Sequence, residues 1–248
     1  MATIDYLDQL AASAPGRAYK QDVLAALDLQ PGQTALDIGC GPGTDLADLA
    51  AGVTPTGSVI GLDHDLVMVD QARARLAASP NVEVRVGDAH AMPLDDGTVD
   101  RARVDRVLQH LADPVRVMAE FGRVARPGAR IVMAEPDWDG LLIDSPDLSR
   151  SRALTRYVTT EVIRNPDIGR SLARLATRAG LTVRSVTAVT PVISDFDTAD
   201  QLFGLRRTTA RAVDAGYLDT NAPAWLDRLA SEPFLASCTI FIAVAEAF

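Results

Sequence analysis

Short hydrophobic runs alternate with amphipathic stretches along the first two-thirds of the chain, a pattern typical of parallel strands covered by helices. The runs that predict strands are 34–39, 58–63, 82–88, 100–108 and 130–135. Later β-rich runs at 181–193 and 239–245 predict two more strands. The pattern therefore predicts an α/β fold built on a mostly parallel sheet.

Helices are expected between these runs, and two of them are marked by their ends. Asp113 caps the first helix and Pro127 ends it. Asn165 caps the second, which is expected over 166–179. The other helices are expected over 198–215 and around Trp225. The segment 137–164 interrupts the alternation, with turns at 138–140 and 145–147, and is therefore a place for an insertion that covers a substrate.

The composition narrows the classes of partner. Hydrophobic residues make up 48% of the 248 residues and charged residues 23%, as in ordinary globular proteins. The net charge of −9 repels polyanions, so no nucleic acid is expected as a partner. The two cysteines, Cys40 and Cys238, are too few for a cysteine-built zinc site, and no metal is expected. No apolar run approaches about 18 residues, so we expect a cytoplasmic protein without a membrane partner.

The sharpest motif is a glycine loop at residues 35–44, ALDIGCGPGT, where an apolar strand meets three glycines at alternate positions. Glycines let the main chain turn tightly and let a ligand approach it closely. A dinucleotide-binding fingerprint would need a glycine at Thr44, and Asp45 with Asp48 would repel a pyrophosphate. Asp37, at the end of the strand, instead suits a cationic amine.

Two further acids end the next two predicted strands. Asp63 lies about 20 residues past the glycine loop and can accept both hydroxyls of a ribose. Asp88 follows the third strand and can accept an adenine amino group. Met68, on the helix after Asp63, either covers the adenine or belongs to the core. Acids at three consecutive strand ends beside a glycine loop favour a nucleoside-containing cofactor.

With these motifs, the chain resembles the class I S-adenosylmethionine-dependent methyltransferases, and most closely the UbiE-like (methyltransferase type 11) small-molecule subgroup. The resemblance is strong over about residues 30–135. It implies a doubly wound, Rossmann-like seven-stranded sheet, mostly parallel with an antiparallel last strand and helices on both faces. It also implies S-adenosylmethionine as the cofactor. The cofactor-binding residues expected on this basis are Asp37, Gly39, Cys40, Gly41, Gly43, Thr44, Asp63, His64, Met68, Asp88, Ala89 and Arg106.

The side of the site that would bind the methyl acceptor is less determined, because alignment of the two reactants can suffice for methyl transfer. His110 follows the fourth strand, where the resemblance places the methyl group, and an imidazole can accept a proton near neutral pH. We therefore predict His110 as the catalytic base, with a packing role as the alternative. Arg106 would face the cofactor carboxylate or an anionic acceptor. The acceptor-binding residues expected are Tyr19, Asp137, Trp138, Tyr157, Phe203 and Arg207.

The sequence therefore predicts one domain over 1–248. It would have an N-terminal helical cap at 1–30 and two insertions, at 137–165 and 198–231, that cover the acceptor. The predicted function is methyl transfer to an oxygen, nitrogen or carbon of a small molecule in natural-product or secondary metabolism, by a monomer or homodimer. A quinone or lipid methyltransferase is an alternative, although no basic amphipathic helix supports it. Another alternative binds the cofactor without transferring methyl, as a cyclase or ligand-binding module. A third alternative, a nicotinamide oxidoreductase, is supported by the glycine loop alone.

Overall fold

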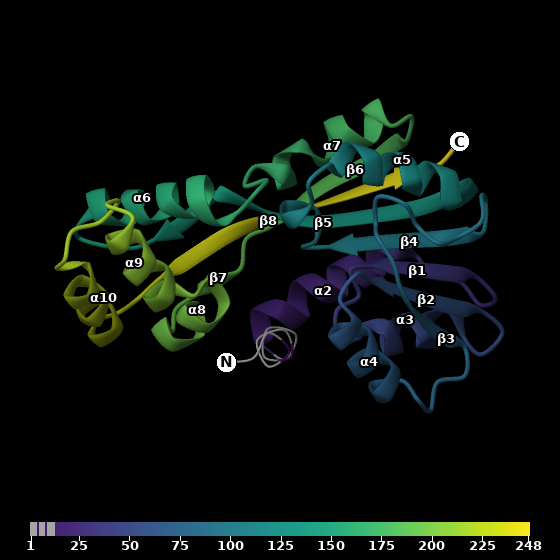
Figure 1. The fold of residues 1–248 in the computed structure, drawn as a ribbon, viewed down its shortest axis with the longest axis horizontal. Helices are drawn as coiled ribbons and strands as arrows, with labels where there is room; N and C mark the ends of the chain where they lie inside the picture. The colour runs from purple at the N-terminus through teal and green to yellow at the C-terminus, as the bar shows by residue number, and fades with distance from the viewer. Residues whose placement is uncertain (1–3, 5–7, 9–12) are drawn as a thin grey trace.

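The computed structural model describes residues 4, 8 and 13–248, and its described part contains one eight-stranded sheet (Figure 1). Seven strands lie in the order β3-β2-β1-β4-β5-β8-β6, and β7 pairs with β8 beside this row. The strands are β1 (Thr34–Ile38), β2 (Ser58–Asp63), β3 (Val82–Val86), β4 (Val99–Asp105), β5 (Ala125–Ile143), β6 (Thr182–Val189), β7 (Val192–Ile193) and β8 (Ala236–Glu246). Strands β1 to β5 pair in parallel, whereas β8 is antiparallel to β5 and β6. The predicted Rossmann-like fold with an antiparallel last strand is confirmed.

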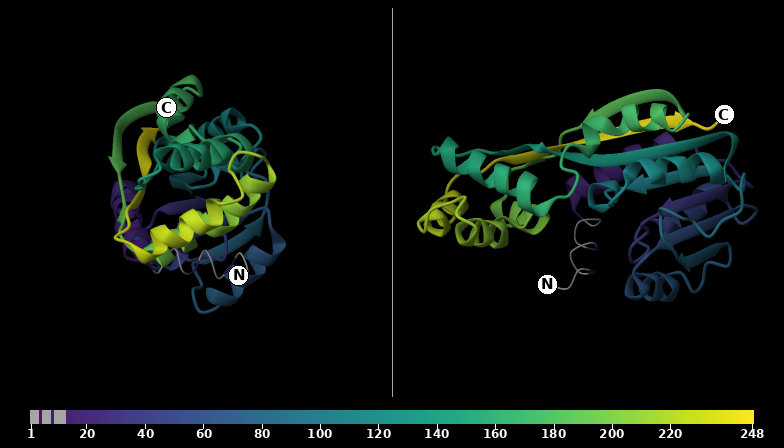
Figure 2. Two further views of the ribbon diagram at one scale, coloured as in Figure 1. Left: turned by 90° about the vertical axis from the view of Figure 1, so that its left-hand side faces the viewer. Right: turned by 45° about the horizontal axis from the view of Figure 1, so that its top comes forward.

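Helices cover both faces of this sheet. The helices are α2 (Ala14–Leu27), α3 (Leu46–Val53), α4 (Leu66–Arg75), α5 (Pro114–Val124), α6 (Leu148–Tyr157), α7 (Ile168–Arg178), α8 (Phe196–Phe203), α9 (Leu205–Asp214) and α10 (Ala222–Ser231), with the short helices η1 (Leu108–His110) and η2 (Val158–Val162). Buried residues of α5 and α7 form one core cluster with the sheet, and those of α2, α3 and α4 form another on the opposite face. Figure 2 shows the two layers from other directions.

The strand β5 is much longer than the run that predicted it. Residues 130–135 were expected, but β5 extends to Ile143, and the turn expected at 138–140 is wrong. A register shift between Asp137 and Leu142 lets β5 keep its pairing with β8 as far as Ile143 opposite Ala236. Such a bulge breaks the alternation of buried and exposed positions, which is why the pattern resembled a turn.

Two helix predictions also need correction. The helix expected over 198–215 is divided at Gly204, whose φ of 62° is left-handed, into α8 and α9. Asn165 does not cap the helix that follows it, because α7 begins at Ile168 with Asp167 at the cap position. By contrast, the Asp113 carboxylate accepts the Arg116 N–H and caps α5 as expected.

The extended ends of β5 and β8 form a two-stranded ribbon that carries a C-terminal lobe, seen at the left of Figure 1. We define this lobe as η2, α6, β7 and α8 to α10 with the lobe ends of β5 and β8. Its core is a third hydrophobic cluster that includes Leu154, Leu205 and Trp225. Most of the predicted insertions 137–165 and 198–231 lies in this lobe. Of the predicted N-terminal cap, residues 1–3, 5–7 and 9–12 lie outside the described residues, and α2 forms much of the remainder.

Candidate functional site

The glycine loop follows β1 at the edge of the sheet where the parallel strands end. Gly39, Gly41 and Gly43 have φ values of 67°, 53° and 78°, which lie in the left-handed region that favours glycine. The N–H groups of Gly39 and Cys40 donate to the carbonyl of Leu62 at 2.7 and 3.1 Å. A Cβ on Gly39 would overlap the side chain of Val107. The loop therefore needs glycine for its turn and for its close approach to the chain that follows β4.

Asp63, at the end of β2, binds the glycine loop directly. Its Oδ2 accepts the N–H of Gly41 at 2.8 Å, and its Oδ1 accepts the N–H of Asp65 at 2.9 Å. Each carboxylate oxygen can accept a further hydrogen bond, so this group can still bind a diol. His64 lies beside it, with Nδ1 3.4 Å from Oδ1 and a side chain that is 87% exposed.

The end of β3 brings Asp88 to the same edge, because β2 and β3 are paired up to Asp63 and Val86. Asp88 is exposed, and its Oδ1 lies 2.6 Å from Nδ1 of His90 and accepts the His90 N–H at 2.8 Å. These two hydrogen bonds lower the pKa of Asp88. Ala89 and Met68 are buried near this edge, Met68 on α4.

A buried group of charges, which we call the charge cluster, lies beneath the glycine loop and consists of Lys20, Asp37, Asp45, Arg103 and Asp105. Arg103 of β4 is paired in register with Asp37 of β1, and its Nε lies 3.2 Å from Oδ1 of Asp37. Its Nη2 binds Asp45 and lies 3.5 Å from Asp105. Lys20 of α2 binds Asp45 and lies 3.9 Å from Asp105.

The charge cluster holds three carboxylates and two cations, and a third cation, Arg106, lies next to it with Nε 3.8 Å from Asp105, so the formal charges balance. Burial raises the pKa of Asp37 to about 6, an effect that Arg103 opposes. Burial also acts to raise the pKa of Asp45, but Arg103 and Lys20 outweigh it and lower that pKa to about 2.

The residues present fit the two ends of S-adenosylmethionine. Its amino-acid end carries an ammonium and a carboxylate, and the charge cluster offers carboxylates and cations. Nη1 of Arg103 is buried and has no hydrogen-bond partner among the residues that the structure describes. The adenosine end requires an acceptor for the ribose hydroxyls, and Asp63 provides one beside the glycine loop.

Residues 106–111, which we call the post-β4 loop, are held by side chains from three segments. Glu135 Oε1 accepts the N–H groups of Val107 and Leu108 at 2.8 and 2.6 Å. Gln109 Nε2 donates to the carbonyl of Arg106, a residue with a left-handed φ of 58°. Asn165 Nδ2 donates to the carbonyls of Leu108 and Leu111, both at 2.8 Å. This loop is therefore held from outside by Glu135 and Asn165 and from within by Gln109. The sequence did not predict that these three side chains hold it.

His110, the predicted base, lies at the end of η1 with an exposed side chain. Partial loss of hydration lowers its pKa, and the positive charge of Arg106 lowers it further. The neutral imidazole is therefore the dominant form near neutral pH, and this is the form that accepts a proton. The role of His110 as a base remains a prediction.

The structure brings some predicted acceptor residues together. The indole Nε1 of Trp138 donates to Oε1 of Gln109 at 2.7 Å, which ties Trp138 to the post-β4 loop. Trp138 also packs edge-to-face against Phe203 of α8, with ring centroids 6.2 Å apart. These contacts place an aromatic pair between the post-β4 loop and the C-terminal lobe.

Other predicted acceptor residues lie elsewhere. Tyr157 is buried in the lobe core against Tyr217, and Asp137 is buried in an ion pair with Arg170 of α7. Arg207 is exposed on α9. Tyr19 joins the charge cluster instead, since its hydroxyl donates to Asp105 at 3.4 Å.

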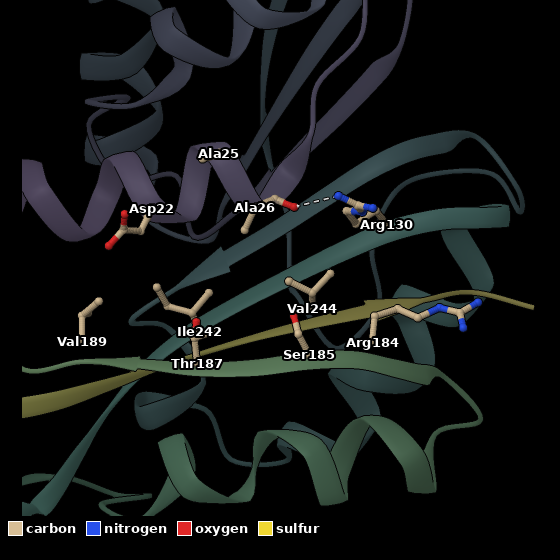
Figure 3. A pocket seen from close by; sticks show the side chains of 10 residues that line it. All are labelled: Asp22, Ala25, Ala26, Arg130, Arg184, Ser185, Thr187, Val189, Ile242 and Val244. Atoms are coloured by element: carbon tan, nitrogen blue, oxygen red, sulfur yellow. Dashed lines mark hydrogen bonds between the residues drawn. The ribbon is translucent and has the colours of Figure 1, made fainter.

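A cavity of about 500 Å³ lies beside α2, on the face of β6 and β8 (Figure 3). Its lining contains none of the predicted site residues. The two arginines in its wall are already paired, Arg130 with Asp28 and Arg184 with Glu246. Within the described residues, no cluster of three histidine, cysteine or acidic side chains could hold a metal ion, and no helix has the length and apolarity to cross a membrane.

The buried carboxyl of Glu135 should make the free energy of unfolding depend on pH. Burial raises its pKa to about 8 from an ordinary value of 4.5. The folded state therefore holds this proton more tightly, so stability is highest below the unfolded pKa and declines as the pH rises towards 8. Glu135→Gln keeps a neutral acceptor for Val107 and Leu108, and should remove a slope of about 1.4 kcal/mol per pH unit.

Urea unfolding of both proteins between about pH 5 and pH 8.5 measures this difference. Asp37 contributes a change in the same direction, but it is present in both proteins and cancels. Parallel stability profiles for the two proteins would contradict the prediction.

Three comparisons relate the chain to known proteins. A family model described as a methyltransferase domain matches residues 29–174. The chain is 56% identical to the "uncharacterized 37.1 kDa protein in transposon TN4556" of Streptomyces fradiae, over 98% of this chain and 71% of that protein. It is 34% identical to the demethylmenaquinone methyltransferase of Shouchella clausii, over 53% of this chain and 57% of that enzyme. This match therefore spans only a little over half of the enzyme's length.

Solved structures show the same fold at low identity. A putative methyltransferase from Bacillus halodurans superposes with a TM-score of 0.68 at 15% identity, over 91% of this chain and 97% of that one. The geranyl diphosphate C-methyltransferase of Streptomyces coelicolor, in complex with S-adenosylhomocysteine, superposes with a TM-score of 0.61 at 16% identity, over 94% and 80%.

Proposed function

Because this chain belongs to the class I S-adenosylmethionine-dependent methyltransferases, with S-adenosylmethionine as its cofactor, we propose that it methylates a small organic molecule. The observation that carries the proposal is the meeting, at one sheet edge, of the glycine loop, Asp63 and the charge cluster. We propose that the two ends of the cofactor are held there, so that its methyl group is directed towards the post-β4 loop. The acceptor would lie between this loop and the C-terminal lobe.

When bound, the cofactor supplies a methyl group on a positively charged sulfur. The acceptor attacks this methyl group from the side opposite the sulfur and displaces the sulfur. The protein holds and orients the reactants. Asp63 and the glycine loop bind the adenosine end, while the charge cluster binds the amino-acid end. Glu135, Gln109 and Asn165 keep the post-β4 loop in one conformation. His110 accepts the proton of an acceptor that carries one.

The aromatic pair Trp138 and Phe203 supports a planar or otherwise apolar acceptor, because both rings lie at the boundary between the post-β4 loop and the lobe. The similarity to a demethylmenaquinone methyltransferase favours a quinone as a second candidate acceptor. Quinol acceptors carry a long isoprenoid tail that small aromatic acceptors lack. A panel of acceptors with and without this tail therefore separates the two candidates.

Isothermal titration with S-adenosylhomocysteine, with NAD as the control, tests the cofactor assignment. We expect micromolar binding of S-adenosylhomocysteine and no binding of NAD. Incubation with labelled S-adenosylmethionine and the acceptor panel then tests transfer. Labelled product with one class of acceptor supports the proposed function. Tight cofactor binding without turnover on any acceptor would favour a protein that binds the cofactor without transferring methyl.

A further inference from the structure

Arg103 uses only part of its guanidinium within the protein. It is 3% exposed, and its Nε and Nη2 face the three carboxylates of the charge cluster. Its Nη1 and Nε are both buried and have no hydrogen-bond partner among the described residues, although Nε lies 3.2 Å from Oδ1 of Asp37. A buried donor without a partner destabilises the folded protein, and such groups in native proteins call for an explanation. An anionic ligand that accepts a hydrogen bond from Nη1 would be such an explanation.

The surroundings of this donor fit one kind of ligand. The three acids next to Arg103 would repel a plain anion. A zwitterion suits the site, since its ammonium can face the carboxylates while its carboxylate faces the unpaired nitrogen. An α-amino acid group has both charges a few bonds apart.

We propose that Arg103 is the residue that binds the carboxylate of the cofactor's amino-acid end, through Nη1. The proposal rests on the proposed function, because it takes the cofactor as given and assigns one of its groups. It gives Arg103 two roles. The guanidinium pairs with Asp37, Asp45 and Asp105, and it also selects ligands that carry the full amino-acid group.

Two other cations lie nearby, and the structure separates them from this role. Lys20 contacts Asp45 from α2 and has a more exposed side chain, at 12% against 4% for Arg103. Arg106 lies after β4 with a side chain that is 20% exposed, its Nε 3.8 Å from Asp105. Both lie nearer the solvent, whereas Arg103 is next to Asp37 beneath the glycine loop.

A comparison of two ligands and several variants tests the proposal. The ligands are S-adenosylhomocysteine and S-adenosyl-3-thiopropylamine, which lacks only the carboxylate. We expect the unmodified protein to prefer the first by on the order of tenfold to a hundredfold, the range for hydrogen bonds to charged groups. Arg103→Lys should lose most of this preference, because affinity falls for S-adenosylhomocysteine and changes little for the analogue.

Arg101→Lys is the matched control, since Arg101 lies on the same strand and faces Asp28 instead of the charge cluster. It should keep the full preference. Arg106→Lys should keep it as well. An unchanged preference in Arg103→Lys, or its loss in Arg106→Lys, overturns the proposal.

Binding of the carboxylate-free analogue also reports that the variant is folded. If Arg103→Lys binds neither ligand, a double variant, Arg103→Gln with Asp45→Asn, is tested in its place. This variant removes one positive and one negative charge, so the net charge of the cluster is unchanged. The same loss of preference is expected in that double variant, and a retained preference overturns the proposal. Equal affinity of the unmodified protein for both ligands overturns it too. Failure of the unmodified protein to bind either ligand would instead contradict the proposed function.

Discussion

Replacement of Asp63 by alanine should weaken the binding of S-adenosylhomocysteine by on the order of a hundredfold or more. The carboxylate has two functions that the change removes together. It accepts the N–H groups of Gly41 and Asp65, which positions the glycine loop, and in the proposed complex it accepts the ribose hydroxyls. Loss of a charged hydrogen-bonding group costs about 1.5–3 kcal/mol per bond, so two ribose contacts account for the effect.

Isothermal titration measures this change, with Asp70→Ala as the matched control. Asp70 is an exposed acid on the neighbouring helix α4, paired with Arg73 at 3.5 Å. The control removes the same charge at a similar place and should bind as the unmodified protein does. Equal affinities for the Asp63 and Asp70 variants would show that Asp63 does not hold the cofactor.

Replacement of Gly39 by alanine should be the most damaging single methyl addition in the glycine loop. The residue has a left-handed φ of 67°, and a new Cβ would overlap Val107 of the post-β4 loop. Strain of this kind costs about 1–2 kcal/mol, and overpacking against a stiff β-branched side chain adds about 1–3 kcal/mol. We expect a loss of about 2–5 kcal/mol in the free energy of unfolding, together with loss of cofactor binding.

Gly97→Ala separates these two contributions. Gly97 has nearly the same left-handed φ, 62°, but a Cβ there meets nothing within 4 Å. Its replacement should therefore cost about 1 kcal/mol, from backbone strain alone, and leave binding intact. Urea denaturation of both variants gives the comparison. Equal losses would mean that the approach of Val107 to Gly39 has no energetic importance.

The glycine loop and the acids beside it could be located from the sequence because their determinants are local. A glycine needed for a left-handed turn and an acid at a strand end are both visible in short motifs, and β2 was predicted with its observed bounds, Ser58–Asp63. The order of the strands then brings Asp63 and Asp88 to one edge. Sequence spacing alone was sufficient there because parallel strands end on the same side.

The remaining features depend on contacts between distant segments. Asn165 was interpreted as a helix cap, since that is the usual role of asparagine before a helix, but it binds carbonyls more than fifty residues earlier. The burial of Arg103 arises from its pairing with Asp37 of another strand. One signal was available, since Arg103 and Asp105 occupy alternate positions of β4 and so share one face.

The C-terminal lobe is built from two separate stretches of chain, one between β5 and α7 and one after β6. Neither has a core of its own, because Leu154 of the first packs in one cluster with Leu205 of the second. Trp225 donates to Ser145 at 2.9 Å across the two stretches. An evolutionary change of acceptor that rebuilds one stretch would therefore leave the other without its packing partners. Relatives with different substrates should differ in both stretches together, and a chimaera should exchange them as a pair.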